Sequence, residues 1–203
     1  WKRLRIAPKR RLRELQKDPT LVAQRDDLTI ELSRLYNLTG EHEAARSLIA
    51  TRHFQPWEGG EGLALDQHVR THLALGKQRL GAGDGAGALV MFKHALETPG
   101  NLGEAKHLLV NQADIYYFLG QAARLTGDLE SAKEFWLHSA TFVGDFQEMS
   151  VRQYSEMTFY SAMSLKSLGK LKRSEKLLRD LLSFAKKLEE TRIESRTAAS
   201  FAV

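Results

Sequence analysis

Apolar residues recur along most of this chain at spacings of three and four, which is the period of an amphipathic α-helix. Short segments rich in glycine, proline and asparagine separate these stretches and are typical of turns. The pattern predicts an all-α protein with helices at 9–17, 27–38, 41–52, 64–81, 85–97, 103–126, 128–142, 149–168 and 170–188. Residues 191–203 lack this regularity, so we predict an irregular C-terminal tail there.

A glycine recurs at four of the predicted helix junctions, and the residues after it follow a fixed order. A small residue lies five positions on, and a large apolar residue lies four positions further. The four copies are Gly40, Ala45 and Ile49; Gly83, Ala88 and Phe92; Gly127, Ala132 and Trp136; and Gly169, Ser174 and Leu178. The glycines lie 43, 44 and 42 residues apart. Glycine can end a helix in the left-handed conformation, and a small residue lets two helices approach closely.

The two central copies also have a Leu-Gly pair, ending in Gly76 and Gly120, twelve residues before the small position. These features resemble the tetratricopeptide pattern. The first and fourth copies have Ser33 and Ala162 instead, and terminal repeats are often degenerate. We therefore predict that residues 25–190 form a tetratricopeptide-like right-handed α-solenoid of about four helix pairs, with a period longer than the usual ~34 residues.

Positive charge is concentrated at the start of the chain. The 203 residues carry a net charge of +5, whereas residues 1–17 alone carry eight Lys or Arg against Glu14. We interpret residues 1–24 as a basic N-terminal arm or helix. A solvated helix, or a helix packed on a preceding domain, is favoured over an anionic contact, so we do not expect a nucleic-acid partner. The chain starts at Trp1 without a signal-peptide pattern, and we expect it to be part of a longer protein.

Several kinds of site are not expected from this composition. The chain has no cysteine, which excludes disulfides and thiolate metal sites and is compatible with a reducing cytoplasm. No apolar run approaches the roughly 20 residues of a membrane span. His68 and His72 share a helix face but have no matching third ligand, so we favour a packing or surface role over metal binding. We predict no cofactor, no metal and no catalytic residue in this chain.

The connectors between helix pairs are the first candidate binding region, because their recurrence at nearly the repeat period would place them on one edge of a solenoid. Glu58 and Glu61 are candidate paired carboxylates beside Trp57, a candidate sugar-stacking platform. The alternative is that the acids favour a helix N-terminus and the tryptophan packs between repeats. The further candidates are Asn101, Glu104, Asp145, Arg152, Tyr154 and Glu156. For the last four, the alternative is an N-cap followed by an ordinary amphipathic helix.

The second candidate region is the concave face, which the first helix of each tetratricopeptide pair provides. Transferring the tetratricopeptide positions to this chain places there Arg70, Lys77, Asp114, Tyr117, Gln121, Arg124, Glu156 and Phe159. Their mixture of charges and aromatic rings suits a peptide or polar ligand, but it also suits any solvated helix face.

Four segments carry a more specific resemblance: RDDL at 25–28, PWEGGEG at 56–62, NLGEA at 101–105, and GDFQEM with YSEMTFYSA within 144–162. They resemble the C-terminal tetratricopeptide region of a family of large bacterial proteins that carry an N-terminal β-rich domain of unknown function. The resemblance covers roughly residues 8–190. It implies a cytoplasmic, multidomain bacterial protein with a link to carbohydrate metabolism and no assigned catalytic residues.

From these patterns we expect a non-catalytic interaction module of a larger protein. Its partner would be a protein or peptide, or the N-terminal domain of its own chain. The alternative is a carbohydrate-binding or carbohydrate-processing region whose site is completed by a missing N-terminal domain.

Overall fold

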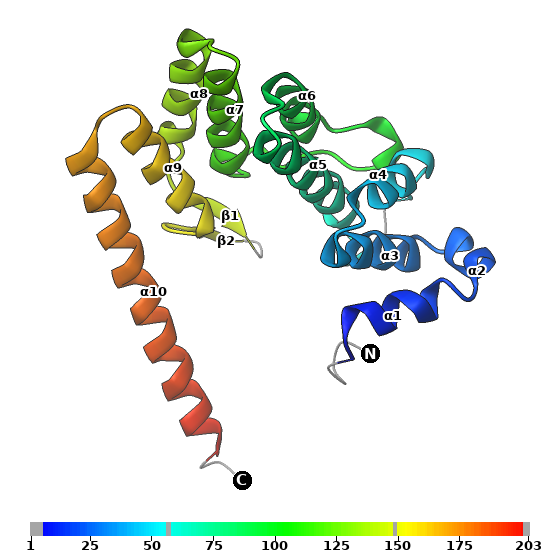
Figure 1. The fold of residues 1–203 in the computed structure, drawn as a ribbon. Coiled ribbons are helices and arrows are strands. Elements are labelled where there is room, and N and C mark those ends of the chain that lie inside the picture. The colour runs from blue at the N-terminus through cyan, green and yellow to red at the C-terminus, as the bar shows by residue number, and fades with distance from the viewer. Residues whose placement is uncertain (1–5, 56–57, 148–149, 201–203) are drawn as a thin grey trace. The chain divides into compact units, whose positions relative to one another are not determined.

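The computed structural model describes residues 6–55, 58–147 and 150–200, and helices dominate it (Figure 1). The helices are α1 (Pro8–Leu15), α2 (Pro19–Gln24), α3 (Asp26–Thr39), α4 (His42–Thr51), α5 (Leu63–Gly81), α6 (Gly85–Leu96), the 3₁₀ turn η1 (Gly100–Leu102), α7 (Ala113–Leu125), α8 (Leu129–Thr141), α9 (Glu156–Ser167) and α10 (Leu171–Ser200). One antiparallel hairpin pairs β1 (Asp145–Gln147) with β2 (Ser150–Arg152). The predicted all-α class is confirmed.

The chain divides into two compact units. The first contains the chain up to Leu108 together with Leu125–Gly127, and the second contains Leu109–Arg124 and the chain from Asp128 onward. Within each unit, helices that follow one another in the sequence pack on one another, such as α3 with α4, α5 with α6 and α9 with α10. This succession is the packing expected of an α-solenoid.

The four predicted junction glycines all adopt the left-handed conformation, with φ of 88°, 81°, 85° and 74° in chain order. The small residue five positions after each glycine is buried in every copy. In the second and third copies, Asp84 and Asp128 follow the glycine and accept a hydrogen bond from the backbone at Gly87 and Ser131. Each junction therefore ends one helix and begins the next, as the sequence predicts.

The Leu-Gly glycines make room for the large residue of the same copy. A Cβ atom on Gly76 would lie 2.3 Å from the Phe92 ring, and one on Gly120 would lie 2.3 Å from the Trp136 indole. The first copy instead combines Ser33 with the smaller Ile49. A larger side chain on the second helix is thus combined with a smaller residue on the first helix, so that the two helices can still pack closely.

Two predicted helix starts were wrong. The helix predicted at 103–126 begins only at Ala113, because the side chain of Asn111 caps it by accepting a hydrogen bond from Ala113 N at 2.9 Å. The helix predicted at 149–168 begins at Glu156, after the hairpin, where Ser155 and Thr158 form a capping box. The short helix α2, which follows the N-cap Asp18, was not predicted.

The two ends of the chain also differ from the prediction. The irregular tail was wrong over residues 191–200, because α10 continues to Ser200 through a sequence without glycine or proline. Within the basic N-terminal segment, Leu12 and Leu15 of α1 are buried against α3. Arg11 is also buried and forms an ion pair with Glu31 of α3. The described part of this segment is therefore a packed helix.

Candidate functional site

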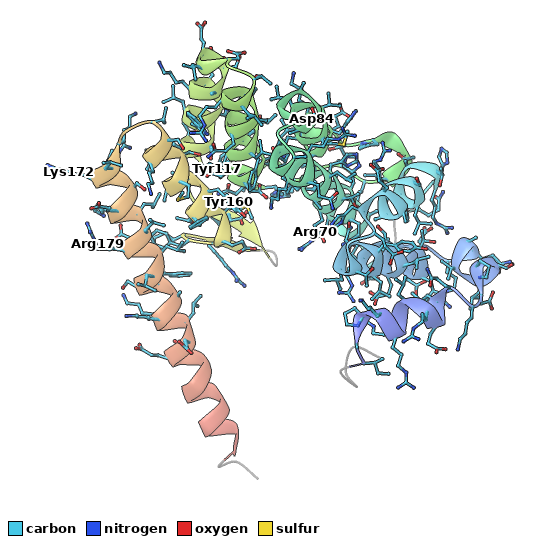
Figure 2. The ribbon with its side chains drawn as sticks, viewed as in Figure 1. Arg70, Asp84, Tyr117, Tyr160, Lys172 and Arg179 are labelled. Carbon is cyan, nitrogen blue, oxygen red and sulfur yellow. The ribbon has the colours of Figure 1, made fainter. Side chains whose placement is uncertain are left out.

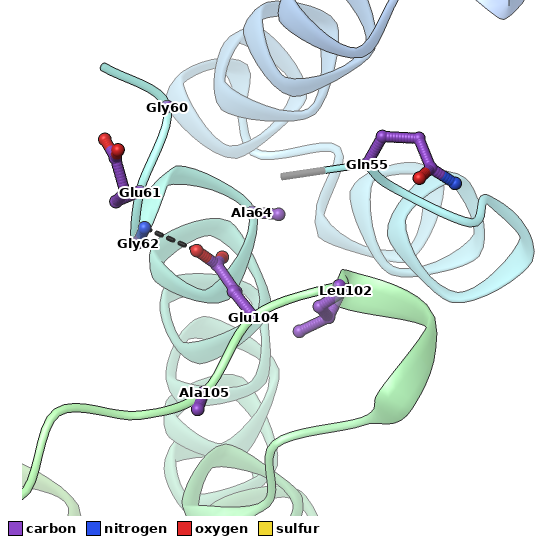
Figure 3. A pocket seen from close by; sticks show the side chains of 9 residues that line it. Gln55, Gly60, Glu61, Gly62, Ala64, Leu102, Glu104 and Ala105 are labelled. Atoms are coloured by element: carbon purple, nitrogen blue, oxygen red, sulfur yellow. Dashed lines mark hydrogen bonds between the residues drawn. The ribbon is translucent and has the colours of Figure 1, made fainter. Parts of the chain in front are cut away.

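Glu104, a predicted binding residue, caps the helix that begins near it. Helix α5 starts after Gly62, which has no side chain to bind the free N–H groups of the first turn. The Glu104 carboxylate accepts hydrogen bonds from Gly62 N and from Leu65 N, the latter at 2.6 Å (Figure 3). A carboxylate at a helix N-terminus is favoured by the helix dipole. The residue therefore fixes α5 from the connector that follows α6.

Asn101 has the corresponding role at the other end of the first connector. Its side-chain amide donates hydrogen bonds to the main-chain carbonyls of Ile49 and Arg52 at 2.9 and 2.8 Å, at the C-terminus of α4. The main-chain carbonyl of Asn101 accepts a hydrogen bond from Phe54 N at 2.8 Å. Asp26, from the RDDL segment, binds the Arg52 guanidinium and accepts from Gln55 N at 2.9 Å. Both residues hold the connector in place.

A cavity of about 290 Å³ lies beside these caps (Figure 3). Its walls are glycine and alanine residues and the apolar side chain of Leu102, together with the polar residues Gln55, Glu61 and Glu104. This volume is at the lower end of the usual range for ligand sites. Glu58 is exposed on the same connector, whereas Trp57 lies outside the described residues. The structure thus places one of the two predicted connector acids, Glu61, at a cavity.

A second cavity, of about 200 Å³, is lined by three histidines on α5 and α6. The rings of His68 and His72 lie 4.2 Å apart, and those of His72 and His94 lie 5.6 Å apart. Burial lowers the pKa of His72 to about 4, and it also lowers the pKa of His68. Both are buried, and their rings contact each other at a tilt of 49°, as a packing role predicts. His94, which the sequence analysis missed, pairs with Glu97 at 2.9 Å.

In the second unit, the four candidates around the hairpin belong to different local structures. Asp145 is buried and accepts a hydrogen bond from Asn111 N at 3.1 Å. Arg152 lies opposite Asp145 in the hairpin register. The Tyr154 ring lies 5.5 Å from the Phe184 ring of α10. Glu156 is exposed in the first turn of α9.

Aromatic rings of α7 and α9 meet in the second unit (Figure 2). The Tyr160 ring lies 5.8 Å from that of Tyr117 and 5.6 Å from that of Phe118. Phe159 is 44% exposed, and its ring lies 5.4 Å from that of Tyr160. Burial raises the pKa of the Tyr160 hydroxyl, and the charges of Asp114, Tyr117 and Glu156 add to the increase. We call these residues the acidic–aromatic surface: Asp114, Tyr117, Phe118, Glu156, Phe159 and Tyr160.

Four of these six residues are among the predicted concave-face positions: Asp114, Tyr117, Glu156 and Phe159. Each residue that α7 contributes to this surface has a counterpart on α9 that lies 42 residues later in the sequence. Asp114 and Glu156 are one such pair, and the junction glycines Gly127 and Gly169 are separated by the same number of residues. Phe118 and Tyr160 were missed, although they too are separated by this repeat and each follows a predicted position.

The other predicted concave-face residues are not part of this surface. Arg70 pairs with Asp66 on α5 at 2.7 Å, and Lys77 is exposed on the same helix. Gln121 is half-buried on α7, and Arg124 is exposed in the last turn of that helix.

Comparison with known proteins found no family model and no solved structure that matches the chain. The resemblance to large bacterial tetratricopeptide proteins therefore stays a prediction. The described part of the chain has no group of three or more His, Asp or Glu side chains placed to hold a metal ion. Within the same residues, no helix combines the length and apolarity needed to cross a bilayer.

The carbohydrate alternative also stays a prediction. It depends on Trp57, which lies outside the described residues. It also depends on polar side chains, and several of these form hydrogen bonds with the main chain of the protein itself. These are the side chains of Asn101, Glu104 and Asp145.

Proposed function

We propose that this chain is an interaction scaffold and that its acidic–aromatic surface binds a basic segment of a protein. The observation that carries the proposal is the 5.8 Å approach of the Tyr117 and Tyr160 rings from the first helices of two successive repeats. Ring faces attract Lys and Arg side chains, and this attraction strengthens as the cation loses water. Asp114 and Glu156 add negative charge beside the rings.

The repeat supports binding of an extended segment rather than of a single side chain. An acidic residue and an aromatic residue three positions later occur on α7 and again on α9: Asp114 with Tyr117, and Glu156 with Phe159. A peptide that crosses both helices would meet the same pair of groups twice. Tyrosine suits such contacts, because it offers a large ring with few rotatable bonds.

Peptide selection tests this function. A library of random peptides is panned on the whole chain, and selected peptides are titrated by fluorescence anisotropy. We expect selected peptides to contain Lys or Arg near apolar residues, and Tyr117→Leu and Tyr160→Leu to weaken their binding at least about tenfold, the loss of one strong ring–cation contact.

Tyr116→Leu is the matched control, because Tyr116 lies on the same helix but its ring packs on His138 at 3.9 Å. Peptides without basic residues, or equal binding by all three variants, would contradict the proposed function.

A further inference from the structure

Each half of the acidic–aromatic surface combines a carboxylate with an aromatic ring one helical turn later. Asp114 precedes Tyr117 by three positions on α7, and Glu156 precedes Phe159 by three positions on α9. Side chains at this spacing are neighbours on one side of a helix. Both carboxylates also act on the Tyr160 hydroxyl, where their charges add to the increase in its pKa. A side chain bound to this surface can therefore meet a ring and a carboxylate together.

The surface is open to solvent rather than enclosed. Glu156 and Phe159 are exposed, and Tyr117 and Tyr160 are half-buried. The two tyrosine rings lie 5.8 Å apart at a tilt of 47°. A cation held between two parallel ring faces needs a separation of about 7–8 Å, which is twice the ~3.5–4.0 Å of a close contact. The tyrosine pair is therefore not a slot that encloses a cation, and a cation bound here keeps part of its contact with water.

Lysine and arginine respond differently to such an open surface. An ammonium group is compact and strongly hydrated, and its attraction to a ring becomes large only when its water is removed. A guanidinium group is more weakly hydrated, and its flat face stacks on an aromatic ring. The guanidinium therefore gains more from a ring that remains partly exposed.

The neighbouring carboxylates favour the same side chain. A guanidinium carries five N–H donors in one plane, so its edge can form two parallel hydrogen bonds with a carboxylate while its face stays on a ring. An ammonium group has three N–H donors on a single nitrogen and no separate face for the ring. Its contacts with the ring and with the carboxylate therefore compete for the same atoms.

We propose that the acidic–aromatic surface selects arginine over lysine in the segment that it binds. The guanidinium stacks on an aromatic ring of α7 or α9, and its edge binds Asp114 or Glu156 on the same helix. This inference rests on the proposed function, because it names the side chain that the basic segment must carry.

Three versions of one selected peptide test the preference, with all basic positions occupied by arginine, by lysine or by homoarginine. Homoarginine has the stem of lysine and the head group of arginine, and all three versions carry the same charge. Affinities for the whole chain are measured by anisotropy. We expect the lysine version to bind roughly tenfold more weakly than the arginine version, and the homoarginine version to recover most of this loss.

Variants of the protein locate the preference. The ratio of the arginine to the lysine affinity should fall towards one in Tyr160→Leu and in Glu156→Gln, whose exposed side chain can change without loss of packing. It should be retained in Tyr116→Leu, the variant outside the surface. An unchanged ratio in both surface variants would overturn the assignment to this surface.

The outcomes also separate this inference from the proposed function. A lysine version that binds as tightly as the arginine version, or a homoarginine version that binds as weakly as lysine, would overturn the preference and leave the proposed function standing. Selected peptides without basic residues would contradict the proposed function and the preference with it.

Discussion

The two units use their polar side chains differently. In the first unit, Asn101 and Glu104 direct their hydrogen bonds into the main chain at the ends of α4 and α5. In the second unit, Tyr117, Glu156 and Phe159 lie on helix faces that are at least partly open to solvent. The distinctive connector residues of the first unit can therefore be explained by the structure of the connectors themselves. A long connector separates helix ends from their neighbours, and those ends still need capping groups.

Gly76→Ala should have the largest effect, and it should act on the first unit. The new methyl group would lie 2.3 Å from the Phe92 ring, so the helices α5 and α6 would have to separate. We expect a loss of about 3 kcal/mol in the free energy of unfolding, from overpacking. Chemical denaturation measures the loss, and hydrogen exchange should locate it in α5 and α6.

Gly81→Ala is the control for this change, since a Cβ there would meet nothing within 4 Å. Adding Phe92→Leu to Gly76→Ala should recover about half of the loss, because a smaller side chain suits the larger neighbour. Equal stability of the Gly76 and Gly81 variants would contradict the packing argument.

Acidification should destabilise the first unit through its buried histidines. Because the pKa of His72 falls from 6.5 to about 4 on folding, the unfolded chain binds the proton more tightly. The contribution of neutral His72 to the free energy of unfolding is therefore complete above pH 6.5. It decreases as the pH falls towards 4, by about 2 kcal/mol after allowance for screening. Chemical denaturation at several pH values measures how the free energy of unfolding depends on pH. His72→Gln should reduce this dependence on pH.

Glu104→Gln tests the cap of α5. The amide retains the shape of the carboxylate but loses its charge at the helix N-terminus, so we expect about 1 kcal/mol of destabilisation. Thermal unfolding compares it with Glu61→Gln, which changes the exposed acid at the same cavity. A larger loss for Glu61→Gln would show that the cap is not the important contact in this connector.

Glu156→Gln should have the smallest effect on stability, less than about 0.5 kcal/mol, because the side chain is exposed. If the proposed function is correct, it should nevertheless weaken binding of a selected basic peptide several-fold and reduce the salt dependence of that binding. Anisotropy titrations at two salt concentrations measure both effects. Glu134→Gln on α8, an exposed acid outside the surface, provides the comparison.

Most helices and all four junctions follow from local patterns in the sequence. The period of apolar residues places most helices, and Gly40, Gly83, Gly127 and Gly169 end them as predicted, because these are local properties of the backbone. The repeat also placed Asp114 and Glu156 at equivalent positions.

The role of the connectors, in contrast, depends on contacts that form only in the folded chain. Glu104 binds Leu65 across 39 residues, and Asn101 binds Ile49 across 52, so neither partner can be read from local spacing. The same holds for the hairpin, where Asp145 accepts from Asn111, 34 residues earlier. Backbone groups left free at a helix end can form a hydrogen bond with any suitable side chain that the fold brings near. Which side chain arrives depends on contacts distant in the sequence, and these form only when the helices pack.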